Sequence, residues 1–123
     1  MKRLLLVLLI GCGGSPAPAP TPPPAANKAD EAKALDQEGQ DLMAKGNFAD
    51  AEKKFIAAYN KDVQSQYCFD LCSAEEKLGK FQQAVNACNK VKLHNPTPEL
   101  QQKADALVQQ IQTEAKAQNV ELQ

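Results

Sequence analysis

One six-residue pattern occurs twice in this chain, and the spacing between its copies limits the possible folds. Residues 46–51 read GNFADA and residues 79–84 read GKFQQA, so the copies lie 33 residues apart. A period in the low thirties is typical of repeats built from two antiparallel helices. The sequence therefore predicts an all-helical fold of two hairpins, in which each pair of helices is joined at a glycine turn.

Apolar and small residues support this prediction, because they mark one helical face on each side of both turns. The residues after about position 27 are rich in strong helix formers, and no run alternates with the period of a strand. The four predicted stripes are Ala32, Leu35, Gly39 and Leu42; Phe48, Ala51, Phe55, Ala58 and Tyr59; Cys68, Leu71, Cys72 and Leu78; and Phe81, Ala84, Val85, Cys88 and Val91.

A fifth helix is predicted after the second hairpin. Pro96 ends the hairpin, Thr97 is a suitable N-cap, and Pro98 fits the first turn of a new helix. We expect this helix over about residues 97–118, as a cap on the domain formed by residues 27–118. Its predicted buried stripe is Leu100, Ala104, Leu107, Val108, Ile111 and Ala115.

The two hairpins resemble tetratricopeptide repeats, with units at about residues 32–64 and 65–98. The alternative is an unrelated five-helix bundle, which the repeated turn disfavours. The chain departs from the family pattern where large residues are usual: Leu35 and Cys68 replace an early aromatic residue, and Glu75 replaces an apolar one. The matching positions are Gly39, Gly46, Ala51, Phe55 and Ala58 in the first unit and Leu71, Gly79, Ala84 and Pro96 in the second.

The first eleven residues have the features of an export signal. A basic start, MKR, precedes the apolar run LLLVLLI, which is far too short to span a bilayer. The tetrapeptide LIGC that ends at Cys12 resembles the lipobox of bacterial lipoproteins. This resemblance implies cleavage before Cys12, lipidation of its thiol and anchoring by acyl chains. The alternative is an ordinary secretory leader with a chance cysteine.

The resemblance also implies an address in the bacterial cell envelope. Gly13 follows Cys12 where, in many enteric bacteria, an aspartate would signal retention in the inner membrane, so we expect the outer membrane, facing the periplasm. Residues 12–26 then form a lipidated, proline-rich linker, in which the prolines exclude helix and sheet. Its expected role is to separate the domain from the lipid surface; the alternative role is that of a ligand for a proline-binding module.

No residue pattern points to catalysis, to a cofactor or to a metal. His94 is the only histidine and stands beside Asn95 and Pro96, where a solvated helix-end residue is the expected role. A net charge of −1 without a basic stripe argues against a nucleic-acid partner. We therefore expect a non-enzymatic protein.

Three cysteines in the predicted domain are the most specific chemical feature. An envelope compartment permits disulfides. If the second hairpin folds about Gly79, Cys72 and Cys88 lie at nearly equal distances from the turn, whereas Cys68 lies one turn further away. We predict a Cys72–Cys88 disulfide with Cys68 as a buried thiol. The alternatives are a Cys68–Cys88 bond and three buried thiols that only pack.

By the same family resemblance, the first helix of each hairpin lines an inner groove where partners dock. An aromatic side chain off the core face is an efficient anchor, which makes Phe69 the favoured contact, although it could instead pack on the cap helix. Two functions stay open: a lipid-tethered adaptor that docks an envelope protein or peptide, and a structural or self-associating spacer. The predicted groove residues are Asp36, Gln40, Met43, Phe69, Ser73, Glu76 and Lys77.

Overall fold

The computed structural model of the chain describes residues 27–123. The predicted signal peptide, Cys12 and the proline-rich linker lie outside this range. Five α-helices follow one another: α1 (Lys28–Ala44), α2 (Phe48–Lys61), α3 (Ser65–Lys77), α4 (Phe81–Val91) and α5 (Pro98–Ala117), with a short 3-10 helix, η1 (Lys92–His94), before α5. The described range contains no strand, so the predicted all-helical class is confirmed. None of its helices is long and apolar enough to cross a bilayer.

The repeated glycines produce the same turn at the end of α1 and of α3. Gly46 has φ +76° and Gly79 has φ +71°, a left-handed conformation that glycine adopts without a steric cost. At the first turn the amide of Gly46 donates to Met43 O at 3.0 Å and the next amide donates to Leu42 O at 2.9 Å. The second turn has the same two bonds, to Glu76 O and Glu75 O. These bonds satisfy carbonyls that a helix end leaves unpaired.

The end of α5 repeats this geometry without a glycine. Asn119 has φ +55°, its amide donates to Lys116 O at 3.1 Å, and the amide of Val120 donates to Ala115 O at 2.8 Å. The last helix therefore ends as the first helix of each hairpin does. After this turn the chain runs only to Gln123, whose amide donates to the Gln82 side chain on α4 at 2.7 Å.

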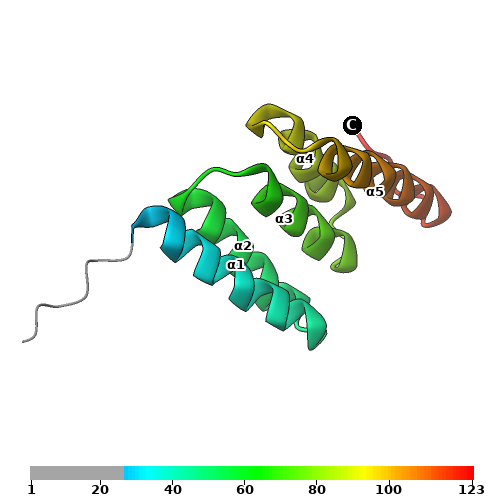
Figure 1. Cartoon of the computed structure of the whole chain (residues 1–123). Coiled ribbons are helices and arrows are strands. Elements are labelled where there is room, and N and C mark those ends of the chain that lie inside the picture. The colour runs from blue at the N-terminus through cyan, green and yellow to red at the C-terminus, as the bar shows by residue number, and fades with distance from the viewer. Residues whose placement is uncertain (1–26) are drawn as a thin grey trace, which may run out of the picture.

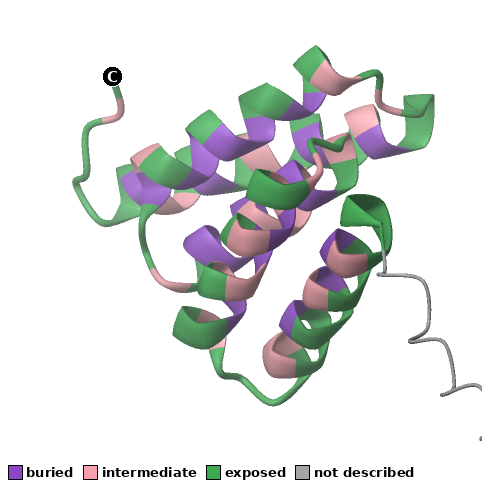
Figure 2. Ribbon diagram, turned by 90° about the vertical axis from the view of Figure 1, so that its left-hand side faces the viewer, coloured by how far each residue is buried: buried purple, intermediate pink, exposed green. Residues whose placement is uncertain are grey.

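The helices pack as two hairpins and a terminal helix (Figure 1). α1 packs on α2, and α3 packs on α4; α3 also packs on α2, and α5 packs on α4. In addition, α3 contacts both α1 and α5, so the first helix of each hairpin and the terminal helix are neighbours along one side of the stack. Figure 2 shows that buried positions follow the inward stripe of each helix while the outward stripe of α5 is exposed. The helical hairpins and capping helix expected from the sequence are therefore present.

The two helices of the first hairpin approach closely at one glycine. Phe55 on α2 is almost fully buried, and a Cβ atom at Gly39 on α1 would lie 2.5 Å from its Cε1 atom. Such a distance is shorter than any carbon–carbon contact, and the ring is enclosed by the core. Gly39 is therefore required by packing, not by its backbone angles.

We predict that Gly39→Ala destabilises the domain by about 1–3 kcal/mol through overpacking. Helix propensity alone predicts the opposite sign, a gain of about 1 kcal/mol. Urea unfolding in a Phe55→Leu background is the matched control, because the smaller side chain removes the clash and the substitution should then become neutral or stabilising. A stabilising effect in both backgrounds would show that the helices do not meet at this position.

A disulfide connects the two helices of the second hairpin. Cys72 on α3 and Cys88 on α4 are joined, with Cα atoms 5.3 Å apart, and both are fully buried. This is the pair that the sequence favoured. Cys68 is a buried free thiol, and burial raises its pKa to about 11. Since the thiolate is the nucleophile in disulfide exchange, Cys68 is protected from attacking the neighbouring bond.

Peptide mapping under non-reducing conditions should recover the Cys72–Cys88 bond, with Cys68 slow to alkylate at pH 8 until the chain is unfolded. Closing a loop of this size stabilises a domain by about 3 kcal/mol in the chain-entropy model. We therefore expect reduction to lower the free energy of unfolding by about that amount, and Cys68→Ala to leave the bond in place. A Cys68–Cys88 bond, or rapid alkylation of Cys68 in the native protein, would contradict this arrangement.

Candidate functional site

The seven predicted groove residues occupy α1 and α3, the two helices that lie side by side in the stack, but they differ in accessibility. Gln40 and Lys77 are exposed, whereas Met43, Phe69 and Ser73 are half-buried. Asp36 and Glu76 are buried, with 7% and 6% of their surface exposed. The seven residues therefore lie on two neighbouring helices, and two of the charged ones are engaged in contacts between helices.

A surface hollow of about 370 Å³ brings four of these residues together. Phe69, Ser73, Glu76 and Lys77 form the α3 wall. The opposite wall comes from α5, which sequence reasoning treated only as a cap. The signal that could have revealed this wall is the spacing of its members by three and four residues along one helix face. Its members are Lys103, Ala106, Leu107 and Gln110.

The ring of Phe69 is shared between the core and the hollow. It is half-buried and packs against the main hydrophobic cluster, which α3, α4 and α5 form together. The remaining part of the ring lines the hollow beside Leu107, which is also half-buried and packs against the same cluster. Phe69 therefore combines the two expected roles. It packs on the cap helix, and it still presents apolar surface that a partner could contact.

Glu76 fixes the polar side of the hollow. Its Oε1 atom accepts a hydrogen bond from Gln110 Nε2 at 3.2 Å, and its Oε2 atom lies 3.4 Å from Lys77 Nζ. The first contact joins α3 to α5, and the second neutralises the carboxylate near the surface. The hollow therefore combines an apolar wall with a fixed ion pair and a second lysine, Lys103.

A second polar group lies where α1 meets α3. The carboxyl groups of Asp36 and Asp70 lie within hydrogen-bonding reach of each other. Gln40 Nε2 donates to Asp36 Oδ2 at 2.7 Å, and Gln66 Nε2 donates to both oxygens of Asp70 at 3.1 Å. Burial, and then the neighbouring Asp36, raise the pKa of Asp70 to about 7; burial also raises the pKa of Asp36. Asp70 was not among the predicted groove residues.

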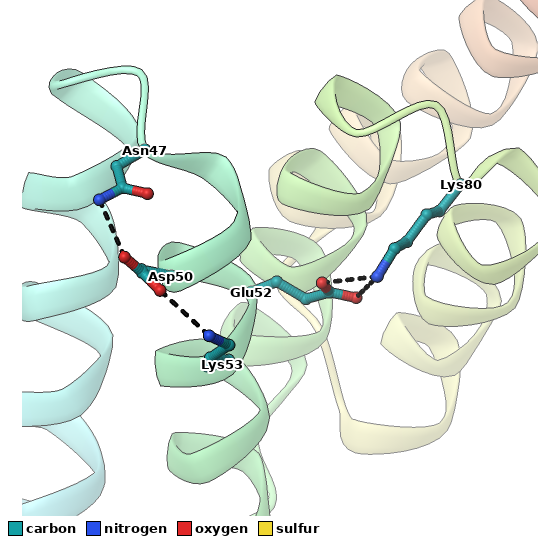
Figure 3. A network of polar contacts seen from close by, with 5 residues as sticks. All are labelled: Asn47, Asp50, Glu52, Lys53 and Lys80. Carbon is teal, nitrogen blue, oxygen red and sulfur yellow. Dashed lines mark hydrogen bonds and ion pairs between the residues drawn. The ribbon is translucent and has the colours of Figure 1, made fainter.

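A third buried carboxyl, Glu75, takes the place where the repeat pattern expects an apolar side chain. It is 6% exposed, and its Oε2 atom has no hydrogen-bond partner in the described part of the chain. Burial, and then the charge of Glu52, raise the pKa of Glu75 to about 7. Lys80 lowers the pKa of Glu75 and so offsets the increase only in part, because its ammonium group is paired with the Glu52 carboxylate at 2.8 Å (Figure 3).

The Glu52–Lys80 pair also connects the hairpins, since Glu52 belongs to α2 and Lys80 precedes α4. A separate local network at the start of α2 joins Asn47, Asp50 and Lys53 (Figure 3). This network is exposed and stays within the first two turns of α2, so it contributes little to stability.

His94 has a structural contact that the sequence did not suggest. Its Nε2 atom lies 3.2 Å from the Tyr59 hydroxyl, and the two rings are 5.8 Å apart. The contact connects η1 to α2 across the stack. Within residues 27–123, no three potential metal ligands gather at one place.

No family model, no curated protein and no solved structure matches this chain. The interpretation of the site therefore depends on its own geometry and on the sequence pattern.

Glu75 generates a pH prediction whose sign follows from its raised pKa. The unfolded chain releases the proton near the ordinary value of 4.5, whereas the folded protein holds it to about pH 7. Between these values the folded state binds more protons, so the free energy of unfolding falls as the pH rises. We predict that Glu75→Gln stabilises the domain at pH 8 by roughly 1–3 kcal/mol and has little effect at pH 4.

Urea unfolding from pH 4 to pH 8 measures this effect, and Glu121→Gln, on the exposed C-terminal tail, is the control for the change in net charge. Part of the slope should remain in Glu75→Gln, because Asp36 and Asp70 also have raised pKa values. A destabilised Glu75→Gln variant with an unchanged pH profile would mean that Glu75 is ionised and paired in the folded protein.

Proposed function

We propose that this chain is a lipid-anchored adaptor of the bacterial cell envelope, of tetratricopeptide type, that docks a protein or peptide partner between α3 and α5. The observation that supports the proposal is the hollow of about 370 Å³ beside Phe69. A hollow of this size accommodates one or two side chains and lies at the lower end of the volumes usual for small-molecule sites. Its mixed apolar and charged lining suits a segment of polypeptide.

The lining defines the chemistry of this segment. Phe69 and Leu107 offer apolar contact, while two exposed residues, Lys77 and Lys103, add positive charge to the lining. An aromatic ring that is already held by core contacts loses little conformational freedom on binding, which favours its use as an anchor. An apolar side chain flanked by polar or acidic groups is therefore the expected ligand feature.

A second candidate function is that of a structural or self-associating spacer. The contact between Phe69 and the α5 side of the core favours it, because an aromatic ring used for internal packing needs no client. The outer face of α5 is exposed and polar, so it offers no apolar stripe on which a further helix could pack. The two functions differ in whether the hollow captures another protein.

Site-specific photocrosslinking of the full chain in living cells tests the adaptor. A photoreactive residue at Ala106, an exposed position that lines the hollow, should capture a distinct partner. The same residue at Asn89, an exposed position on α4, is the control and should capture none. Phe69→Ala should abolish capture at Ala106 without loss of helical content. Capture only of a second copy of this chain would support the spacer instead.

The anchor is tested separately. Cys12→Ser should release the exported protein from the membrane fraction, because no acyl chain can then be attached to residue 12. Cys68→Ser is the matched control, since it changes one thiol of the domain and should leave the protein in the membrane. A Cys12→Ser protein that still requires detergent for extraction would contradict the lipoprotein assignment.

A further inference from the structure

Two carboxyl groups lie in contact between α1 and α3 without a cation. Asp36 is buried and Asp70 is half-buried, on two helices that are neighbours in the stack (Figure 1). Among residues 27–123, no lysine forms an ion pair with either carboxylate. A pair of acidic groups in this position is unfavourable unless something positive compensates it.

When both carboxyls are ionised, the pair is also short of one hydrogen-bond donor. Asp36 Oδ2 accepts from Gln40, but Asp36 Oδ1 is buried and accepts from no other donor of the described chain, apart from a proton held between the two carboxyls. Leaving such an oxygen unpaired costs free energy. Gln40 is exposed, so its amide can turn away and admit another donor beside Asp36.

An arginine side chain has the chemistry that this site lacks. Its planar guanidinium group carries five N–H donors and can span two carboxylates. It is less strongly hydrated than the ammonium group of lysine, which favours arginine where a cation becomes partly buried. Residues 27–123 contain no arginine, and the only one in the chain is Arg3 of the predicted signal peptide. The arginine must therefore come from another molecule.

We propose that Asp36 and Asp70 form a binding site for an arginine side chain of the docked partner. This inference rests on the proposed adaptor function, since both sites lie along the side of the stack that α1, α3 and α5 share. It adds a specificity element: the partner segment carries an arginine that reaches Asp36 and Asp70 while an apolar residue occupies the hollow at Phe69.

Binding of the cation also has a defined proton balance. The guanidinium group favours two ionised carboxylates, so the proton shared by the pair leaves to solvent and binding is tighter at pH 8 than at pH 6. Tyr67 of α3 also faces the pair, and it stays protonated over this range because burial, and then Asp36, raise its pKa. Asp62, at the end of α2, also raises the pKa of Tyr67.

The test uses the mature, lipidated chain in detergent micelles, labelled with nitrogen-15 and titrated with N-acetyl-arginine amide. The neutral isostere N-acetyl-citrulline amide is the control ligand. We expect saturable shifts of the amide signals around Asp36 and Asp70, with the citrulline probe at least about tenfold weaker, as loss of a charged hydrogen-bonded pair implies. Equal binding of both probes, or shifts that map to other carboxylates, would overturn the inference.

Three variants test whether the arginine probe binds at Asp36 and Asp70. Asp70→Asn should abolish the shifts, whereas Asp41→Asn, which removes the same charge from an exposed position on α1, should leave them. Gln40→Ala removes an exposed competing donor without touching the core, so it should keep or tighten binding even if a variant of the buried Asp36 fails to fold. Equal losses of probe binding in Asp70→Asn and Asp41→Asn would show that the probe responds only to the net charge of the domain, which would overturn the inference.

The outcome is separable from that of the adaptor proposal. Arginine binding at Asp36 and Asp70 without capture at Ala106 would support the site and count against a docked partner in the hollow. Capture at Ala106 that is unchanged by Asp70→Asn, together with no binding of the arginine probe, would support the adaptor and overturn the arginine site.

Discussion

The structure depends on α3, the helix that contacts all four other α-helices of the stack. It packs on α2 and α4 and also contacts α1 and α5. A helix enclosed on so many sides has few positions left for solvent, and six of its thirteen residues are buried. Both hairpins and the terminal helix therefore bury part of their surface against α3, as neighbouring units of a repeat array do.

The enclosure of α3 explains why its polar side chains are unusual. Asp70 contacts Asp36 across to α1, Glu75 lies near the Glu52–Lys80 pair, and Glu76 is tied to α5 through Gln110. Packing on a different side of α3 shields each of these three carboxyl groups from water. Burial disfavours the charged form, and for Asp70 and Glu75 it raises the pKa to about 7. An interior that accepts such groups gives up stability, which the disulfide from α3 to α4 offsets.

Features that depend on local sequence were predictable. The turns at Gly46 and Gly79 follow from the need for a left-handed residue at a helix end, and Thr97 caps α5 as its side chain predicted. The all-helical hairpins followed from the 33-residue repeat. The favoured cysteine pair followed from equal distances to one turn, because a hairpin of fixed helical rise determines which side chains are level.

Features that depend on how the helices approach one another were not predictable. Asp36 and Glu76 were expected to face a groove, and both are largely buried: Asp36 lies where α1 meets α3, and Glu76 lies at the edge of the hollow between α3 and α5. Asp70 and the α5 wall of the hollow were missed because their positions also depend on how the helices approach one another. The turn at Asn119 was also missed, since asparagine adopts the left-handed conformation less readily than glycine and gives a weaker sequence signal.

The claim that one enclosed helix holds the stack together is tested most directly by native-state hydrogen exchange of the full mature chain. If α3 couples both hairpins, its amides exchange only through global unfolding, and the inward amides of α2 and α4 exchange with the same free energy. The contradicting result is two separate free energies, with the α1–α2 hairpin still protected under conditions in which α3 and α4 exchange freely. That result would describe two independent hairpins, and the shared face of α1, α3 and α5 would then not persist as a binding surface.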